Sequence, residues 1–406
     1  MSAILEGIKI LDLTRVIAGP MCTQILADMG ATVYKIEKPG EGDDTRRMGP
    51  FLQDPATGQP SNDSALYLAY NRGKHSVTVD IATPEGAQLV RDLALRCDVV
   101  VENYKVGSLA KYGLDEASLR ALKPALIYCS VTGFGQTGPY APKPAYDFIL
   151  QGLAGPMSTC GLPDDQPGGG PMRTAIPMTD MVTGLYATIG ILGALMHRQK
   201  TGEGQAIDAA MLDATVAFNG HLAVGYLMSG QAPLRVGNTN PIASPSEVFD
   251  CADGLIIIAA GNNGQFQQLC AVLGAPDMPA DPRFATNMQR IAHRNELRGA
   301  LQALVRNRSR AQLLQQLSEA SVPAGPINDM AQVFADPQTQ HRHMVVELPH
   351  SSGQTVRVVR SPLNWSSSPV AHKPPPRLGE HSLQTLREEL GLTDAQVEGL
   401  VARGVV

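Results

Sequence analysis

Short apolar segments alternate with helix-like segments over the first third of the chain, and this rhythm limits the fold more than any other feature. Strands are expected at residues 8–13, 31–37, 76–80, 98–102 and 125–131. Helices are expected over 19–30, with Pro20 at an early helical position, from residue 83 onward, and over 115–122. This order predicts a parallel sheet covered on both faces, whose ligands bind beyond the carboxyl ends of the strands.

The remainder of the chain predicts a smaller α+β region and a returning segment. Residues 206–230 are typical of a helix that ends at Gly230, and a stretch rich in Pro, Gly and Asn follows at 231–245. The later elements are expected as a strand at 255–260, helices at 266–273 and 290–320, a hinge or exit loop at 321–326, strands at 345–348 and 355–359, and a last helix at 382–390.

A chain of 406 residues is too long for one simple core, so two domains are expected. We predict a large domain at 1–205, completed by about 340–406, and a small domain at 233–330. A helical linker at 206–232 joins them, and 331–406 forms a return segment with the C-terminal helix.

Charge and composition exclude several classes of function. The net charge of −5 argues against nucleic acid as the main partner, because phosphate binding leaves a basic footprint. Six cysteines without a C-x-x-C pair are expected to be reduced, mostly buried thiols in the cytoplasm, and no metal-ligand spacing is found. We expect no signal peptide, and no membrane span, because the most apolar stretch, 181–196, is too short.

Asp180 is a lone carboxylate at the start of the apolar run 181–196, and two interpretations of it stay open. It caps the helix that begins there, because the first backbone N–H groups of a helix lack intrahelical partners. Alternatively, it is a nucleophile kept ionised by the positive end of the helix dipole. Helix chemistry alone favours the cap.

The turn at 133–138 matches the spacing G-x-G-x-x-G, but we do not expect it to bind a dinucleotide. That motif must open a helix whose N-terminus holds the pyrophosphate. Here Pro139, Pro142 and Pro144 prevent a helix, and the turn follows the fifth strand instead of the first. We interpret it as a glycine-rich turn near a ligand. The second glycine-rich loop, 168–170, is either a flexible connector or a loop close to substrate.

Basic side chains recur near the ends of the predicted strands. They are Lys38, Arg46, Arg47, Arg72, Lys74, Lys105 and Lys111. Surface lysines are usually only solvated charges, but their recurrence at one edge of the sheet indicates a phosphate-bearing ligand. Asn103 and Tyr104 follow the fourth strand at the same edge, either as ligand contacts or as a turn residue and a packing aromatic.

Ordered motifs over nearly the whole chain resemble those of class III CoA-transferases, which include formyl-CoA transferase, carnitine CoA-transferase and α-methylacyl-CoA racemases. The motifs are LDLTRVIAGP at 11–20, KIEKPGEGDDTR at 35–46, NRGK at 71–74, VENY at 101–104, the turn 133–139, KTGEGQ at 200–205 and LGEH at 378–381. The resemblance implies a large Rossmann-like, CoA-binding domain, a smaller α+β domain and an interlocked homodimer.

The resemblance also assigns site residues. It implies that Asp180 is the catalytic aspartate. It places along the CoA site Val16, Ile17, Ala18, Lys38, Lys74, Asn103, Tyr104 and Lys111, to which we add Arg46 and Tyr146. Neither a metal nor a permanently bound cofactor is expected, because coenzyme A and acyl-CoA are substrates.

Two positions separate the two chemistries of this family. Racemases have a His in a Gly-His-Asp triplet and a Glu ahead of a Gln-Phe pair, and these shuttle the α-proton. Here the triplet is Ala145-Tyr146-Asp147, and Asn263 stands ahead of Gln265-Phe266. Because Tyr146 and Asn263 cannot exchange protons as His and Glu do near neutral pH, CoA transfer is favoured over racemisation.

Among the transferases the chain is most similar to succinyl-CoA:dicarboxylate enzymes of the succinate–hydroxymethylglutarate (glutarate) type, through motifs at 175–180, 259–263 and 325–330. Formyl-CoA transferases have four glycines where this chain has 237–240. The implied reaction (EC 2.8.3.-) moves CoA from an acyl-CoA, succinyl-CoA, to a carboxylic acid, a dicarboxylate, through an aspartyl-CoA thioester on Asp180. Arg173 and Arg46 are the candidates for holding the second carboxylate. The alternatives are a racemase of the same fold and a CoA-binding protein without activity.

Overall fold

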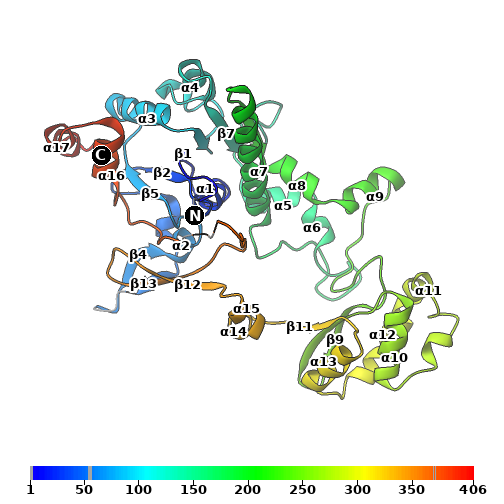
Figure 1. Ribbon diagram of the computed structural model, residues 1–406. Helices are drawn as coiled ribbons and strands as arrows, with labels where there is room; N and C mark the ends of the chain where they lie inside the picture. The colour runs from blue at the N-terminus through cyan, green and yellow to red at the C-terminus, as the bar shows by residue number, and fades with distance from the viewer. Residues whose placement is uncertain (1–2, 54–56, 369, 371) are drawn as a thin grey trace. The chain divides into compact units, whose positions relative to one another are not determined.

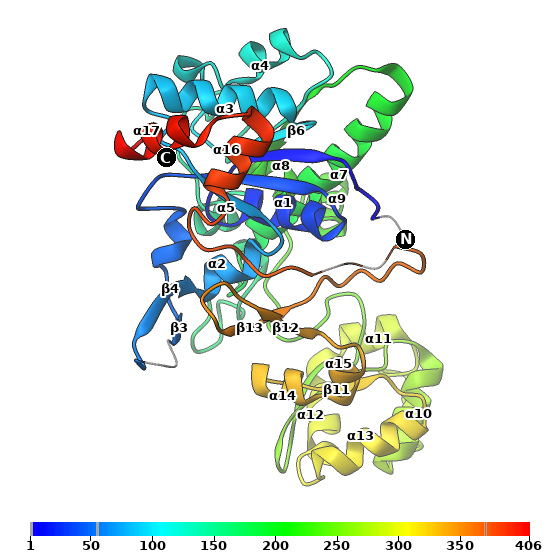
Figure 2. The ribbon, with the colours of Figure 1, turned by 60° about the vertical axis from the view of Figure 1, so that its left-hand side comes forward.

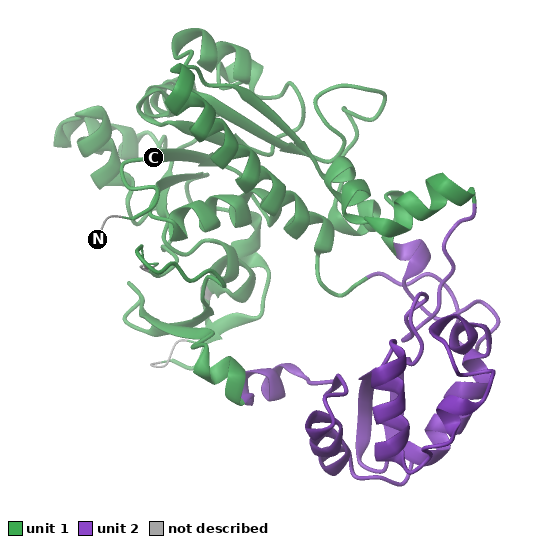
Figure 3. Cartoon of the chain, turned by 45° about the vertical axis from the view of Figure 1, so that its right-hand side comes forward, with its two compact units in different colours: residues 1–156, 174–230, 337–406 green, residues 157–173, 231–336 purple. Residues whose placement is uncertain are grey.

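The computed structural model describes residues 3–53, 57–368, 370 and 372–406, and the chain divides into two compact units (Figure 1, Figure 3). The first unit consists of Met1–Pro156, Thr174–Gly230 and Pro337–Val406. The second consists of Met157–Arg173 and Gln231–Asp336. Residues 157–173, which the sequence placed in the large domain, thus cluster with the second unit.

The first unit is built on a six-stranded sheet in which every neighbouring pair is parallel. Across the sheet the strands are β5 (His75–Thr78), β2 (Thr32–Glu37), β1 (Lys9–Leu13), β6 (Val99–Glu102), β7 (Ile127–Thr132) and β8 (Ala206–Ala210). The chain runs outward from β1 to β5 and then returns to the other side of β1 at β6. Sheets of this Rossmann-like order bind ligands at that reversal, beyond the carboxyl ends of β1 and β6.

Helices cover both faces of this sheet, which confirms the predicted α/β class. Figure 2 shows α3 (Pro84–Arg96) above the strands and α1 (Ala18–Asp28) below them. Alternate strand residues point to the two faces. One face packs on α1 and α7 (Met178–Thr201) through Ile10, Val33, Val101 and Cys129. The other packs on α3 and α4 (Glu116–Leu122) through Leu11, Tyr34, Val100 and Tyr128.

Helix α7 extends beyond the apolar run that we identified in the sequence, at both ends. Among the described residues, it is the one helix long and apolar enough to cross a membrane, and half of its most apolar window is buried. Its buried residues Ala187, Ile191, Ala194 and Leu195 belong to the core between α1 and the sheet. The core of the first unit therefore accounts for one apolar face of α7, while Leu185, Ile189 and Met196 remain exposed on another.

The predicted helix over 206–230 is wrong at its start, because Ala206–Ala210 is strand β8 and pairs with β7. Helices α8 (Met211–Phe218) and α9 (His221–Ser229) follow, and Gly220, at φ +55°, separates them. Alanine favours helices locally, but the backbone hydrogen bonds of the sheet edge override that preference. The other elements of this unit are β3 (Phe51–Gln53), β4 (Pro60–Ser64), α2 (Ala65–Tyr70), α5 (Asp147–Leu153), α15 (Pro337–His341), β12 (Val345–Pro349), β13 (Thr355–Val359), α16 (Ser382–Leu390) and α17 (Asp394–Ala402).

The second unit has its own core on a three-stranded antiparallel sheet of order β11-β10-β9. Its strands are β9 (Ser246–Cys251), β10 (Gly254–Ala259) and β11 (Ala324–Pro326), and its helices are α6 (Pro156–Thr159, whose first residue belongs to the first unit), α10 (Asn263–Leu273), α11 (Asn287–Ala292), α12 (Arg294–Val305), α13 (Arg310–Glu319) and α14 (Met330–Ala335). The expected loop at 321–326 is therefore a strand in its second half, because Gly325 pairs with Ile257 of β10.

Candidate active site

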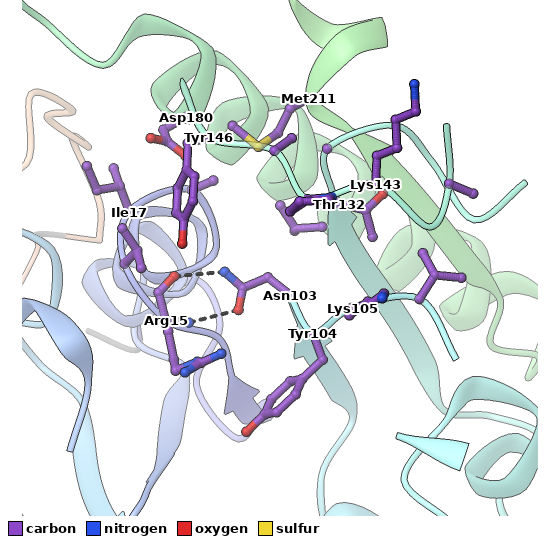
Figure 4. Close-up of a pocket in the computed structure, with 18 of the residues that line it drawn as sticks. Arg15, Ile17, Asn103, Tyr104, Lys105, Thr132, Lys143, Tyr146, Asp180 and Met211 are labelled. Carbon is purple, nitrogen blue, oxygen red and sulfur yellow. Dashed lines mark hydrogen bonds between the residues drawn. The ribbon is translucent and has the colours of Figure 1, made fainter. Parts of the chain in front are cut away.

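A cavity of about 360 Å³ lies at the strand-order reversal of the first unit (Figure 4). Its walls come from 15–18 after β1, 103–106 after β6, 131–133, 141 and 143–146 around the end of β7, and from Asp44, Asp180 and Met211. The predicted site residues that the structure brings together here are Val16, Ile17, Ala18, Asn103, Tyr104, Tyr146 and Asp180. The fold alone thus gathers most of the expected site at one edge of the sheet.

A second cavity, of about 410 Å³, adjoins the first and shares Arg15, Asp44 and Tyr104 with it. This cavity contains Lys38 and Lys111, two more of the predicted residues. Both lysines are exposed, and the ammonium of Lys38 pairs with the carboxylate of Glu41. The two cavities together contain Asp180 at one end and, at the other, exposed lysines among several carboxylates.

Asp180 does not cap its own helix, so that interpretation is wrong. Pro177 occupies the cap position of α7 without a side-chain hydrogen bond, and Asp180 is the third residue of the helix. The cap is supplied by Asp147 of α5, whose Oδ1 accepts hydrogen bonds from the backbone N–H of Thr179 at 2.8 Å and from its hydroxyl at 2.6 Å. The carboxylate of Asp180 is therefore not needed to cap α7.

The carboxylate of Asp180 faces the start of a second helix. The backbone N–H of Ala18, the first residue of α1, lies near enough to this carboxyl to lower its pKa. A side chain at Gly184, one turn further along α7, would place its Cβ 2.8 Å from the carbonyl oxygen of Ala18, so glycine allows the two helices to approach. The first-turn N–H groups and the positive ends of two helices therefore meet at Asp180.

No cation neutralises Asp180. Among the ion pairs of the described residues, none includes this carboxylate. Burial, followed by the negative charge of Asp147, raises the pKa of Asp180 to about 7, although the N–H of Ala18 lowers it. A carboxylate in a cavity with so perturbed a pKa is a candidate for catalysis.

The loop between β1 and α1 holds a strained residue. Val16 has φ +72°, a conformation that β-branched residues rarely adopt. Asn103 fixes the preceding residue from both sides, because its Oδ1 accepts from the N–H of Arg15 at 2.9 Å and its Nδ2 donates to the carbonyl of Arg15 at 2.7 Å (Figure 4). The N–H of Val16 itself donates to Asp43 at 3.3 Å. Side chains from other segments, Asn103 and Asp43, thus hold the loop that leads to Ala18.

Lys74 lies beneath this loop and reaches neither cavity. Its ammonium is buried and contacts Asp12 Oδ2 at 3.0 Å, Pro20 O at 2.9 Å and Asn71 Oδ1 at 2.9 Å. Lys35 is equally buried, pairs with Asp43 at 2.9 Å and donates to the carbonyl of Thr14 at 2.8 Å. The geometry gives Lys74 a supporting role under the loop in place of the direct CoA contact that we predicted.

The two arginines expected to hold a second carboxylate are not among the residues that line the two cavities. Arg46 is buried, donates through Nε and Nη2 to the two oxygens of Glu37 at 2.8 Å each, and stacks over Tyr67 at 3.6 Å. It lines neither of the two cavities. Arg173 is an exposed residue of the second unit. The guanidinium of Arg46 is therefore committed to Glu37.

Sequence reasoning missed several residues of the site. Arg15 and Lys143 bring positive charge to the walls of the Asp180 cavity, which the predicted Lys105 also lines, and Asp147 caps the helix that carries Asp180. Arg15 could have been found, because it follows β1 within two residues at the ligand-binding edge. Nothing in the local sequence signals Asp147, since its partner Thr179 is 32 residues away.

Two other predictions concern the glycine-rich turn and the absence of a metal. Residues 133–146 contain no helix, which agrees with our rejection of a dinucleotide site, and Gly133 lines the Asp180 cavity. A Cβ at Gly133 would lie 2.3 Å from that of Ala145, so the turn requires glycine there. Within the described part of the chain, no group of three or more His, Cys, Asp or Glu side chains is placed to hold a metal ion.

Comparison with known proteins gives consistent matches along the chain. A sequence model described as CoA-transferase family III matches residues 5–382. Succinate–glutarate CoA-transferase of Agrobacterium fabrum is 47% identical over 385 residues, 95% of each chain. Human succinyl-CoA:glutarate CoA-transferase is 39% identical over 403 residues, 99% of this chain and 90% of that protein. The crystal structure of a CAIB/BAIF family protein from Brucella suis is 43% identical, with a TM-score of 0.85 over 96% of this chain and all of the other.

Proposed function

The chain belongs to CoA-transferase family III and is a CoA-transferase, and from this premise we propose that Asp180 is the nucleophile that carries CoA between two acids. The observation that carries the proposal is the position of this carboxylate, which lines a cavity at the strand-order reversal, has no ion-pair partner among the described residues and lies beside Ala18 at the N-terminus of α1. A nucleophile needs such a site, because a carboxylate held in an ion pair is less reactive.

The reaction consists of two acyl exchanges that then run in reverse. One oxygen of Asp180 attacks the thioester carbonyl of the donor, the C–S bond breaks, and CoA thiolate leaves a mixed anhydride. The thiolate attacks the aspartyl carbonyl carbon, the anhydride C–O bond breaks, and the donor acid departs from an aspartyl-CoA thioester. The acceptor carboxylate then attacks that thioester and the same steps return CoA to the new acid. The N–H of Ala18 is placed to donate to the oxyanion that forms on Asp180.

The adjoining cavity suits the nucleotide end of coenzyme A. Lys38, Lys111 and Arg15 supply positive charge there, and Tyr104 offers an aromatic surface between the two cavities. Phosphate groups favour such cations, while the thioester must reach Asp180. We place the phosphates at the lysines and the pantetheine arm along Val16, Ile17 and Ala18.

Succinyl-CoA is the proposed donor and a dicarboxylate the proposed acceptor. Two relatives of this chain are named for succinate or succinyl-CoA and glutarate. A second carboxylate near Asp180 needs a cation, and Arg15 and Lys143 line the same cavity as this residue. Turnover of succinyl-CoA with glutarate, hydroxymethylglutarate, malate, itaconate, mesaconate and oxalate would rank the acceptors. Exclusive use of a monocarboxylate would contradict the assignment.

Asp180→Asn tests the covalent route. We expect transfer from succinyl-CoA to glutarate to fall by roughly 10³-fold or more, because an amide cannot form the anhydride. Wild-type enzyme quenched during turnover should carry a CoA adduct on the peptide that contains Asp180, visible by mass spectrometry and missing from the variant. Near-normal turnover of the variant, or an adduct on another peptide, would refute the nucleophile.

A racemase activity has less support. Tyr146 reaches the Asp180 cavity where racemases have His, and Asn263 of the second unit accepts a hydrogen bond from Arg290 at 3.1 Å. Neither side chain is a base near neutral pH. Exchange of the α-hydrogen of a 2-methylacyl-CoA into deuterated water, measured by NMR, would reveal racemisation if it occurred.

We also propose that the protein is an interlocked homodimer. Large apolar side chains are exposed on α5, α8 and α9 of the first unit, among them Phe148, Ile149, Phe218, Tyr226, Leu227 and Met228. An exposed apolar surface of this kind is typical of a contact with another chain. Light scattering should give twice the mass of one chain at micromolar concentration. A mass of 43.1 kDa would contradict the proposal.

A further inference from the structure

Asp147 lies behind the nucleophile and is not part of the reaction described above. It is the first residue of α5, it is 9% exposed, and it accepts both hydrogen bonds from Thr179 at the start of α7. Thr179 directly precedes Asp180 and is fully buried. The side chain of Asp147 therefore sets the position of the helical turn that carries Asp180.

Gln151, one turn further along α5, completes this contact. Its Nε2 donates to Asp147 Oδ2 at 2.7 Å, and its Oε1 accepts from the N–H of Thr174 at 2.9 Å. Gln151 is completely buried. The pair on α5 thus fixes both the segment that leads into α7 and the first turn of that helix. Each carboxylate oxygen of Asp147 has a neutral donor, and no cation compensates its charge among the ion pairs of the described residues.

The ionisable groups that surround Asp180 come from several elements. Asp147 belongs to α5 and raises the pKa of Asp180. Tyr70, at the end of α2, has its own pKa raised, by burial and by the charge of Asp180. Arg15, Lys143 and Tyr146 line the same cavity from the loops that follow the strands. Asp44, Tyr104 and Lys105 complete the ionisable groups of that cavity wall. Among all these groups, Asp147 is the one whose charge raises the pKa of Asp180.

We propose that Asp147 is a positioning residue that makes Asp180 a stronger nucleophile, by fixing the first turn of α7 and by placing an uncompensated like charge beside it. The inference rests on the proposed nucleophilic role of Asp180. Two neighbouring carboxylates repel each other, and this repulsion ends when Asp180 is acylated and becomes neutral. Asp147 thus favours the covalent intermediates over the free carboxylate.

Asp147→Asn tests the charge, because Asn Oδ1 can still accept from Thr179. Removal of a like charge should lower the apparent pKa of Asp180 by about one pH unit. The variant nucleophile should then be about threefold less reactive when ionised, at a Brønsted slope near one half. The pH profiles of kcat/KM should therefore cross, with the variant about threefold slower at pH 8 and faster than wild type near pH 5.5. Titration of the substrate acids cancels in this comparison.

A second variant separates charge from hydrogen bonding. In Asp147→Asn the new Nδ2 would face Nε2 of Gln151, and two donors would oppose each other. The double variant Asp147→Asn/Gln151→Glu restores an acceptor at residue 151 and keeps the bonds to Thr179 and Thr174. It should regain any turnover lost through that mismatch. Because the new carboxylate at residue 151 returns a negative charge one turn further along α5, the midpoint of its acid limb should lie between those of Asp147→Asn and wild type. A crossing profile in both variants supports the inference. A uniform loss at every pH, or a profile identical to wild type, would overturn it.

A spectroscopic readout distinguishes failure of this inference from failure of the proposed function. Infrared difference spectra of unliganded enzyme, with Asp180→Asn as the reference, report the carboxylate band of Asp180 as a function of pH. We expect its midpoint to be lower in Asp147→Asn. If Asp180→Asn retained full transfer activity, the nucleophile would be refuted while the midpoint still tested the coupling. If the midpoint did not move, the coupling would be refuted even with Asp180 as the nucleophile.

Discussion

Two buried carboxylates of the first unit, Asp12 and Asp180, have opposite environments. Asp12 contacts the ammonium of Lys74 at 3.0 Å and accepts hydrogen bonds from the hydroxyls of Thr14 and Thr23. Burial alone would raise its pKa, but Lys74, Lys35 and these hydroxyls together lower it to about 2. Asp180 has Asp147 as its charged neighbour and a pKa of about 7. The same side chain is stabilised as an anion at one site and destabilised at the other.

The two environments suggest different tasks: Asp12 supports the loop beneath the site, and Asp180 is available for a reaction. The cluster around Asp12 pairs Lys74 with Asp12 and Lys35 with Asp43, and it holds the loop 14–17 from below through the carbonyl of Thr14, so its ammonium groups are engaged within the fold. The site around Asp180 leaves its charge uncompensated and opens to a cavity. Functional carboxylates are expected in such unfavourable settings, because the cost is recovered when the reaction neutralises the charge.

The largest effect should follow from Lys74→Met, which removes one partner of the buried pair. Asp12 would be left charged and buried, and loss of one member of such a pair costs about 3–5 kcal/mol. We expect the free energy of unfolding, measured with urea at pH 7.5, to fall by about that amount. The stability that wild type draws from ionised Asp12 is present above the ordinary pKa of 3.8 and lost as the pH falls toward 2. In Lys74→Met, Asp12 takes up a proton more readily, so the deficit should shrink as the pH falls.

The double variant Asp12→Asn/Lys74→Met is the matched control. It removes both charges and should recover most of the lost stability, because the cost of a broken buried pair comes from the charge that stays behind. Equal losses of unfolding free energy in the single and the double variant would show that the pair itself stabilises the fold. They would contradict the idea that the loss comes from an unpaired buried charge on Asp12.

Asp180→Asn should raise the free energy of unfolding, whereas Lys74→Met lowers it. A carboxyl whose pKa rises from 3.8 to about 7 on folding is destabilised in its ionised form, so its cost to stability grows as the pH rises from 4 to 7 and is constant above. The shift of about three units at 1.36 kcal/mol each sets an upper bound of about 4 kcal/mol, and partial exposure reduces it to about 1–3 kcal/mol. The variant should therefore unfold at higher urea concentration than wild type at pH 8 and equally at pH 4. Asp213 is an exposed carboxylate on α8, so Asp213→Asn should leave the urea midpoint unchanged at both pH values.

The sequence predicted the scaffold better than the support beneath the site. Five strands of the large sheet and their covering helices follow from local periodicity, because buried parallel strands and amphipathic helices each have a strong local pattern. Strand β8 was missed, since Ala206–Ala210 has no such pattern and becomes a strand only by pairing with β7. The three residues of β11 were missed for the same reason.

The candidate site shows the same division. The position of Asn103 and Tyr104 directly after a strand predicted that they lie at the carboxyl edge of the sheet, and both line the Asp180 cavity, but only the resemblance assigned them to the CoA site. Lys74 and Arg46 carry the same charge as Lys38 and Lys111, and sequence cannot tell which of them finds a buried acid in the fold. The cap formed by Asp147 joins residues 32 positions apart, and only tertiary structure reveals it.

The smallest stability effect should come from Val16, whose loop lies between the two regions. Replacement by glycine removes the strain of φ +72°, worth about 1–3 kcal/mol, but adds about 1 kcal/mol of backbone entropy to the unfolded chain. Val16→Gly should therefore raise the free energy of unfolding by about 0–2 kcal/mol, while kcat falls several-fold because the N–H of Ala18 is held less firmly. Val16→Ala, which keeps the Cβ and the strain, should lose less kcat than glycine. If glycine matched alanine in kcat, the rigid loop would have no part in presenting Ala18 to Asp180, and the buried cluster would serve stability alone.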